Sequence, residues 1–131
     1  MRVPVNADPA DELCLRGQTA YQDGAAAEDA VERLYRNRGY GVLARRWRGA
    51  GAEIDLILNN SKGFVFVEVK KAKSHAEAAG RLSPAQLRRI CRAGETYADR
   101  VAAGRFVEMR VDLATVDRLG QIAIVENILP W

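Results

Sequence analysis

The chain has 131 residues, a length that fits one domain better than two. Apolar residues make up 48% of it and charged residues 28%, a balance that argues against a disordered chain. No apolar run approaches the ~20 residues that a membrane helix needs, and residues 1–11 lack the apolar core of a secretory signal, so we expect no membrane association.

The cysteines and the single histidine exclude a standard zinc site. Cys14 and Cys91 form no C-x-x-C pair, and His75 is the only histidine of the chain. Two isolated cysteines are typical of reduced, small apolar residues, so we expect a cytoplasmic protein.

The net charge of +3 is unevenly distributed. Residues 31–50 hold six arginines and one acid, and residues 71–92 hold six basic residues and one acid. If the two blocks meet in space, they form a basic surface suited to a polyanion. The alternative is that these side chains only solvate helix faces. The preference for Arg tilts the choice toward phosphate, because guanidinium binds phosphate through two parallel hydrogen bonds.

A helix and three strands are predicted first in chain order. We treat residues 1–23 as an N-terminal extension of undecided structure. Apolar residues recur at helical spacing over about 25–38, and Gly39 marks the end of that helix. Residues 40–47 predict a strand. The next two strands, over 52–58 and 64–70, are joined by five polar residues and form a hairpin.

The second half of the chain completes an α/β pattern. Ser83-Pro84-Ala85-Gln86 has the residues of a helix start, with Ser as N-cap and Pro at the first helical position. We expect, in order, a polar loop over 71–82, a helix over 83–101, and strands over 106–116 and 121–125. This order predicts one α/β domain over residues 24–131, with a central mixed sheet flanked by helices.

Four charged residues lie at the open end of the predicted hairpin. Strand alternation places Glu53 and Asp55 on one face of the first strand, and Glu68 and Lys70 on one face of the second. Folding the hairpin about its loop sets Asp55 opposite Glu68, with Cβ atoms about 4.5–5.5 Å apart. Two opposed carboxylates repel each other and destabilise a sheet. A divalent cation bound between them would offset this repulsion and explain why both are present.

These residue types suit phosphodiester hydrolysis. Mg²⁺ or Mn²⁺ held by Asp55 and Glu68 would supply Lewis acidity and lower the pKa of a bound water. Lys70 can orient the attacking water and offset charge on the transition state. The alternative is that Glu68 and Lys70 only pair with each other on an exposed strand. The apolar strands and the acid that precedes Glu68 favour the site.

The hairpin resembles a known group of nucleases. Asp55, twelve further residues and then Glu68-Val69-Lys70 resemble the D-x(n)-E-x-K core of restriction-endonuclease-like nucleases. The longer strings at 51–57 and 66–70 resemble the YraN family of predicted nucleases, which are similar to archaeal Holliday junction resolvases. The resemblance covers about residues 24–128 and includes Ala27-Glu28 and Arg110-Val111-Asp112.

The resemblance implies a restriction-endonuclease-like fold and a set of site residues. In it Asp55 and Glu68 are metal ligands, Lys70 is the catalytic lysine, and Glu28 is a further catalytic acid on the first helix. Glu28 is equally well explained as a surface glutamate near a helix N-terminus. Gln86 stands where related nucleases often carry Gln or Lys, and it is equally well explained as a capping residue.

We expect DNA as the partner of this chain. The first hypothesis is a Mg²⁺- or Mn²⁺-dependent endodeoxyribonuclease, with branched DNA as one candidate substrate and a homodimer as one arrangement. The second is a nucleic-acid-binding module that keeps the fold without turnover. The third is a structural subunit that docks on an acidic protein. The residues expected to contact nucleic acid are Gln86 and seven basic residues, namely Arg45, Arg46, Arg48, Lys71, Lys73, Arg88 and Arg89.

Two further residues, Trp47 and His75, each have a functional and a structural interpretation. Trp47 can stack on a base or anchor the core at a strand end, and we expect it in the core. His75 lies in the predicted polar loop, and we expect an exposed side chain rather than a general base.

Overall fold

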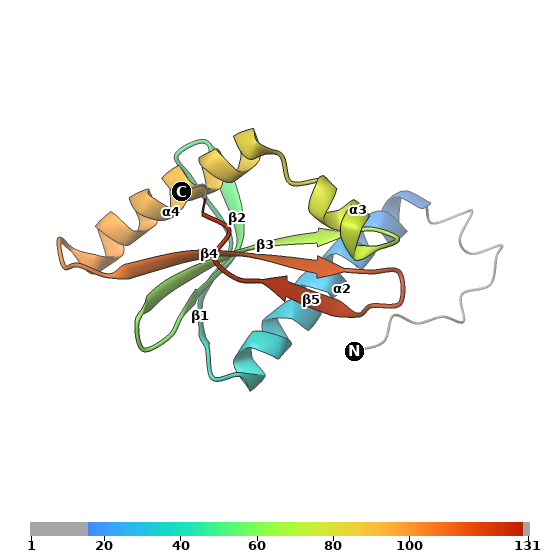
Figure 1. Ribbon diagram of the computed structural model, residues 1–131, viewed down its shortest axis with the longest axis horizontal. Coiled ribbons are helices and arrows are strands. Elements are labelled where there is room, and N and C mark those ends of the chain that lie inside the picture. The colour runs from blue at the N-terminus through green and yellow to red at the C-terminus, as the bar shows by residue number, and fades with distance from the viewer. Residues whose placement is uncertain (1–15, 130–131) are drawn as a thin grey trace.

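The computed structural model describes residues 16–129, with side chains from residue 24 onward. One five-stranded sheet forms its centre, and helices cover both faces (Figure 1). Within residues 16–129, no helix is both long and apolar enough to cross a membrane. The elements, in chain order, are α2 (Arg16–Asn37), β1 (Gly41–Gly49), β2 (Ala52–Asn59), β3 (Gly63–Lys71), α3 (His75–Gly80), α4 (Pro84–Ala102), β4 (Glu108–Val116) and β5 (Ile122–Val125).

The sheet is mixed, as the sequence predicts. Its strands lie in the order β1-β2-β3-β4-β5, and every neighbouring pair is antiparallel except β3 and β4. Two parallel neighbours need a long crossover connection, which α3 and α4 supply here. A mixed sheet flanked by helices is the α/β architecture expected of a restriction-endonuclease-like fold.

Helix α2 covers one face of the sheet, and it begins about nine residues earlier than expected. Its residues Ala27, Val31 and Tyr35 are buried against β2 and β3. The helix runs through Gly24, which an isolated helix tolerates at a cost of about 1 kcal/mol. The expected domain start at residue 24 therefore falls inside this helix. The expected stop is correct, because Gly39 adopts a φ of 91° directly after the last turn.

Helix α4 covers the other face and starts where the sequence predicts. The Ser83 hydroxyl accepts a hydrogen bond from the backbone N–H of Gln86 at 3.0 Å, and Pro84 opens the helix. Its face packs closely on β3, since a Cβ built on Gly94 would lie 2.9 Å from the Phe66 ring. Cys91 is buried in the same layer, as a small apolar residue.

The structure has the short helix α3 within residues 71–82, where the sequence predicts a polar loop. The Ser74 hydroxyl accepts from the Glu77 N–H at 3.1 Å, and Ala78 is fully buried. The Ser-x-x-Glu spacing is a helix-start signal in the sequence. A six-residue helix is too short to show an apolar period, so this signal was the one available.

Candidate functional site

The structure brings Asp55, Glu68 and Lys70 together at the open end of the β2–β3 hairpin. The ladder of backbone pairs ends at Leu56 with Val67, and Asp55 and Glu68 are the next residues beyond this pair on their strands. Beyond this pair, the backbone N–H of Val69 donates a hydrogen bond to the Asp55 carboxylate at 2.8 Å. The hairpin register therefore sets the two acids side by side.

Glu68 is the centre of this group. Its side chain is buried, and its Oε2 lies 3.6 Å from the Lys70 Nζ. The amide Nε2 of Gln86 donates a hydrogen bond to the same oxygen at 2.7 Å. The first turn of α4 thus reaches the strand and fixes the orientation of the carboxyl group. Gln86 does so in addition to its backbone role at the helix start.

The surroundings of Glu68 disfavour the ionised form of its carboxyl group. Burial raises the pKa of Glu68, and the hydrogen bond and negative charge of Asp55 raise it further. The charge of Lys70 lowers the pKa only in part. A divalent cation between the two carboxyl groups would relieve this repulsion.

The donor set fits a hard divalent cation. Among residues 24–129, no cluster of three or more His, Cys, Asp or Glu side chains is arranged to hold a metal. The candidate ligands are therefore the pair Asp55 and Glu68. One or two carboxylates together with waters suffice for Mg²⁺, and such a site leaves positions for a phosphate oxygen.

Helix α2 brings a third acid, Glu28, to the edge of this group. Glu28 and Asp55 line a common pocket of about 220 Å³, and the Arg46 Nε donates to Glu28 at 3.0 Å. Burial is the main reason that the pKa of Glu28 is raised, and the charge of Asp55 adds to it, while the hydrogen bond from Arg46 opposes both. Glu53, expected on the same face, instead accepts from Arg48 at 3.0 Å near the surface.

The predicted basic surface divides into two unequal parts. Each arginine of β1 pairs with an acid: Arg45 with Glu32, Arg46 with Glu28, and Arg48 with Glu53. These acids come from α2 and β2, so the three arginines of β1 are paired within the fold. The β1 part of the first block is therefore paired with acids, unlike the exposed cations of the second block.

The second block keeps its charge at the surface. In the part of the chain that the structure describes, no ion pair joins Lys73, Arg88 or Arg89 to an acid, and all three are exposed. Arg88 and Arg89 follow Gln86 on α4, and Lys71 and Lys73 follow Lys70. Lys73, Arg88 and Arg89 thus follow within three residues of Lys70 or Gln86, the two residues that contact the buried carboxyl group.

The Arg110-Val111-Asp112 segment forms a hydrogen-bond network that stabilises the fold. Asp112 is fully buried and accepts hydrogen bonds from the Tyr35 hydroxyl at 2.8 Å and from two nitrogens of Arg110 at 2.8 and 2.9 Å. The backbone N–H of Asn127 donates to it at 3.0 Å. This network ties α2 and the C-terminal segment to β4.

Trp47 and His75 differ in how they match expectation. Trp47 packs in the core, with its ring edge-on to Tyr97 at a centroid distance of 5.4 Å, as expected. His75 is half-buried, which corrects the expected exposed side chain. Its Nδ1 lies 2.7 Å from the Thr115 hydroxyl, and its Nε2 lies 3.7 Å from Asp117, so it pins α3 to β4.

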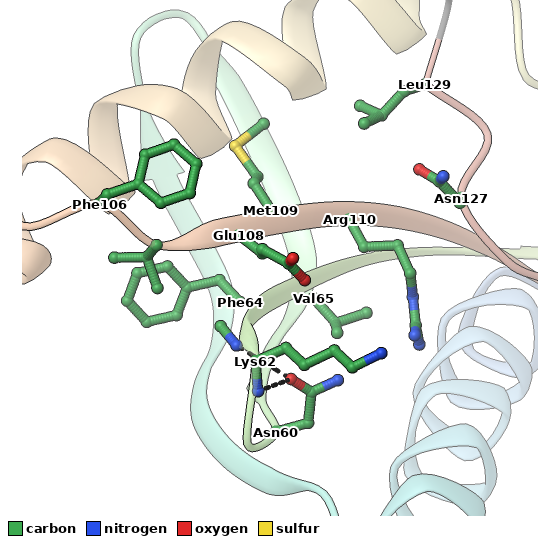
Figure 2. A pocket seen from close by; sticks show the side chains of 12 residues that line it. Asn60, Lys62, Phe64, Val65, Phe106, Glu108, Met109, Arg110, Asn127 and Leu129 are labelled. Atoms are coloured by element: carbon green, nitrogen blue, oxygen red, sulfur yellow. Dashed lines mark hydrogen bonds between the residues drawn. The ribbon is translucent and has the colours of Figure 1, made fainter.

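Another pocket lies away from this group of acids. It has a volume of about 450 Å³ and lies at the other end of β3 and β4, between Phe64, Phe106, Met109 and Lys62 (Figure 2). None of the acids near Lys70 lines it. Pocket size therefore does not identify the candidate site, and the side-chain chemistry does.

Comparison with known proteins places the chain in a family. The model of "Uncharacterised protein family UPF0102" matches residues 27–116, which include every residue of the candidate site. A UPF0102 protein of Cereibacter sphaeroides is 45% identical over 113 residues, covering 86% of this chain and 97% of the relative. UPF0102 proteins of Roseobacter denitrificans and Dinoroseobacter shibae are 48% identical over 86% of this chain, covering 88% and 84% of the relatives. The chain therefore belongs to the UPF0102 family, which is the YraN family that its sequence resembles.

Proposed function

We propose that this protein is a divalent-metal-dependent nuclease that hydrolyses phosphodiester bonds in DNA. The observation that carries the proposal is the contact set of Asp55, Glu68 and Lys70, in which two carboxyl groups and a lysine meet at one sheet end. A buried carboxyl group beside a second carboxyl group costs stability, which favours a use beyond folding. Phosphodiester hydrolysis uses all three groups.

Each residue has a distinct part in the proposed reaction. Asp55 and Glu68 hold Mg²⁺ or Mn²⁺, which when bound supplies Lewis acidity and a bound water of lowered pKa. Lys70 orients the attacking water and offsets negative charge on the phosphate in the transition state. Gln86 is a positioning residue, because its hydrogen bond fixes one oxygen of Glu68. Glu28 contributes a further acid at the rim of the site.

DNA is the proposed substrate because exposed cations follow closely in the chain on Lys70 and Gln86, which contact Glu68. Lys73, Arg88 and Arg89 offer cations for the phosphate backbone without reading the base sequence. Lys71 and Gln86 border the same region. The β1 arginines, Arg45 and Arg48, contribute less in this proposal, since nearby acids already balance their charge. Branched DNA, a homodimer and a cytoplasmic location are further parts of the proposal.

The proposal is tested by cleavage of labelled single-strand, duplex, flap and four-way-junction DNA, with Mg²⁺, Mn²⁺ or EDTA. We expect metal-dependent cutting that falls at least about 100-fold in Asp55→Asn and Lys70→Ala. Glu95→Gln and Lys62→Ala are matched controls on exposed positions and should cut like the wild type. DNA binding without cutting in any metal would contradict the nuclease and favour a binding module. Absence of both binding and cutting would reject DNA as the partner.

A further inference from the structure

Arg46 has a backbone conformation that a strand residue does not ordinarily adopt. It lies within β1 with a φ of 47°, in the left-handed region that favours glycine. Its neighbours keep their strand pairing, with Arg45 opposite Leu56 and Trp47 opposite Ile54. A non-glycine residue persists in this region only where the surrounding structure holds it there, and such residues cluster at functional sites.

This conformation turns two successive arginines toward one helix. Neighbours in a regular strand point to opposite faces of the sheet. Here both Arg45 and Arg46 reach α2, where they bind Glu32 and Glu28, one helical turn apart. Trp47 then returns to the core on the α4 side. The left-handed backbone conformation of Arg46 therefore sets the direction of its side chain.

The guanidinium of Arg46 is directed to the pocket beside the candidate ligand Asp55. Asp55 is the β2 residue between the same two register pairs, so it lies across from Arg46. Arg46, Asp55 and Glu28 all line the pocket of about 220 Å³. Lys70 provides a cation on the Glu68 side of the acidic pair. Arg46 provides one on the Asp55 side.

We propose that Arg46 binds the non-bridging oxygens of the phosphate that is cleaved, and that Glu28 is a positioning residue that holds Arg46 toward the site. The inference rests on the proposed nuclease function. A guanidinium suits this task, because two of its five N–H donors can bind two phosphate oxygens at once. In this scheme the ion pair of Arg46 and Glu28 at 3.0 Å aims the guanidinium before the substrate arrives.

A competing explanation is that the left-handed residue serves packing alone, by returning Trp47 to the core. Arg46→Gly separates the two explanations, because glycine accepts this conformation more readily than any other residue. Ala50→Gly is the matched control, since Ala50 has a φ of 50° in the exposed turn after β1. Both variants should fold, with melting temperatures within a few degrees of the wild type.

The first measurement is single-turnover cleavage with protein in excess, using the best DNA substrate of the panel. We expect Arg46→Gly to cut about 100-fold more slowly, because one transition-state donor is lost. Millimolar guanidinium chloride should restore part of the rate in Arg46→Gly and have no such effect on Ala50→Gly. Arg46→Lys should retain an intermediate rate. Cutting by Arg46→Gly at the wild-type rate would overturn the proposal and leave packing as the explanation.

A double-mutant comparison tests the role of Glu28. If Glu28 acts through Arg46, then Glu28→Gln slows wild-type cleavage but has no further effect in Arg46→Gly. If the rate losses of Glu28→Gln and Arg46→Gly multiply in the double variant, the positioning role of Glu28 is overturned, because Glu28 then acts independently of Arg46.

DNA binding in EDTA separates failure of this inference from failure of the nuclease. If the wild type binds but does not cut, the nuclease fails, and the phosphate contact is judged by affinity alone. Weaker binding by Arg46→Gly than by Ala50→Gly, with rescue by guanidinium chloride, would support the contact. Equal affinity of the two variants for a short duplex would overturn it.

Discussion

Replacing Glu68 by Gln should make the protein more stable when no metal is present. Glu68 is buried, and it shares its position with a second carboxyl group, Asp55. A neighbouring cation, the Nζ of Lys70, lies 3.6 Å from the Glu68 Oε2. The substitution removes a carboxyl group that the fold disfavours in its ionised form, and it leaves Asp55 and Lys70 as a balanced pair. The glutamine oxygen can still accept the hydrogen bond that Gln86 donates.

The expected gain is about 1–3 kcal/mol in the free energy of unfolding at neutral pH. For a chain of this length, about 1 kcal/mol corresponds to roughly 4 °C in melting temperature. Glu53→Gln is the matched control, because Glu53 is partly exposed and pairs with Arg48. A control of this kind should change stability by no more than about 0.5 kcal/mol.

The gain should also depend on pH in a defined direction. The raised pKa of Glu68 means that the unfolded chain ionises first, once the pH passes the ordinary value of 4.5. The folded wild type binds the proton more tightly, so its free energy of unfolding falls as the pH rises from there toward the raised pKa. Glu68→Gln lacks this group. Its advantage over the wild type should therefore grow between about pH 5 and about pH 8.

Urea unfolding in EDTA, followed by circular dichroism at several pH values, measures both effects. Mg²⁺ or Mn²⁺ should then stabilise the wild type more than Glu68→Gln, because the variant has lost a ligand. A variant that is less stable than the wild type at pH 8 in EDTA would refute the reasoning. It would mean that the Glu68 carboxylate is well accommodated in the fold.

Three other predictions test the fold and the basic surface. Tyr35→Phe should lower the free energy of unfolding by about 1–3 kcal/mol in urea titrations, because Asp112 loses a buried hydrogen bond. Gly94→Ala should cost about 1–3 kcal/mol in the same assay, since the new Cβ would lie 2.9 Å from the Phe66 ring. Lys73→Ala should weaken DNA binding uniformly across sequences and reduce the salt-dependence slope by about 1 in fluorescence-anisotropy titrations. An unchanged slope would remove Lys73 from the interface.

Local sequence signals were sufficient for the hairpin and for the start of α4. The alternation of apolar and charged residues set the faces of β2 and β3, and the polar loop between them set the register. Asp55 and Glu68 are neighbours for that reason alone. Ser83 and Pro84 marked the start of α4 equally well, because capping depends on residues within one helical turn.

Tertiary packing decided the rest of the site. Glu28 reaches Asp55 only because α2 packs across β2, and Gln86 reaches Glu68 only because α4 starts above β3. The acids that balance the β1 arginines come from elements up to 18 residues away, so charge counting along the chain could not find them. The left-handed conformation of Arg46 has no local signal.

The sequence by itself determined which strands form the hairpin and that Asp55, Glu68 and Lys70 meet at its open end. Alternation and register act between adjacent strands, so they follow from residue order. The tertiary structure alone decided which charges remain unbalanced and where Arg46 points. Those properties depend on how α2 and α4 pack on opposite faces of the sheet, and packing joins residues that are far apart in the chain.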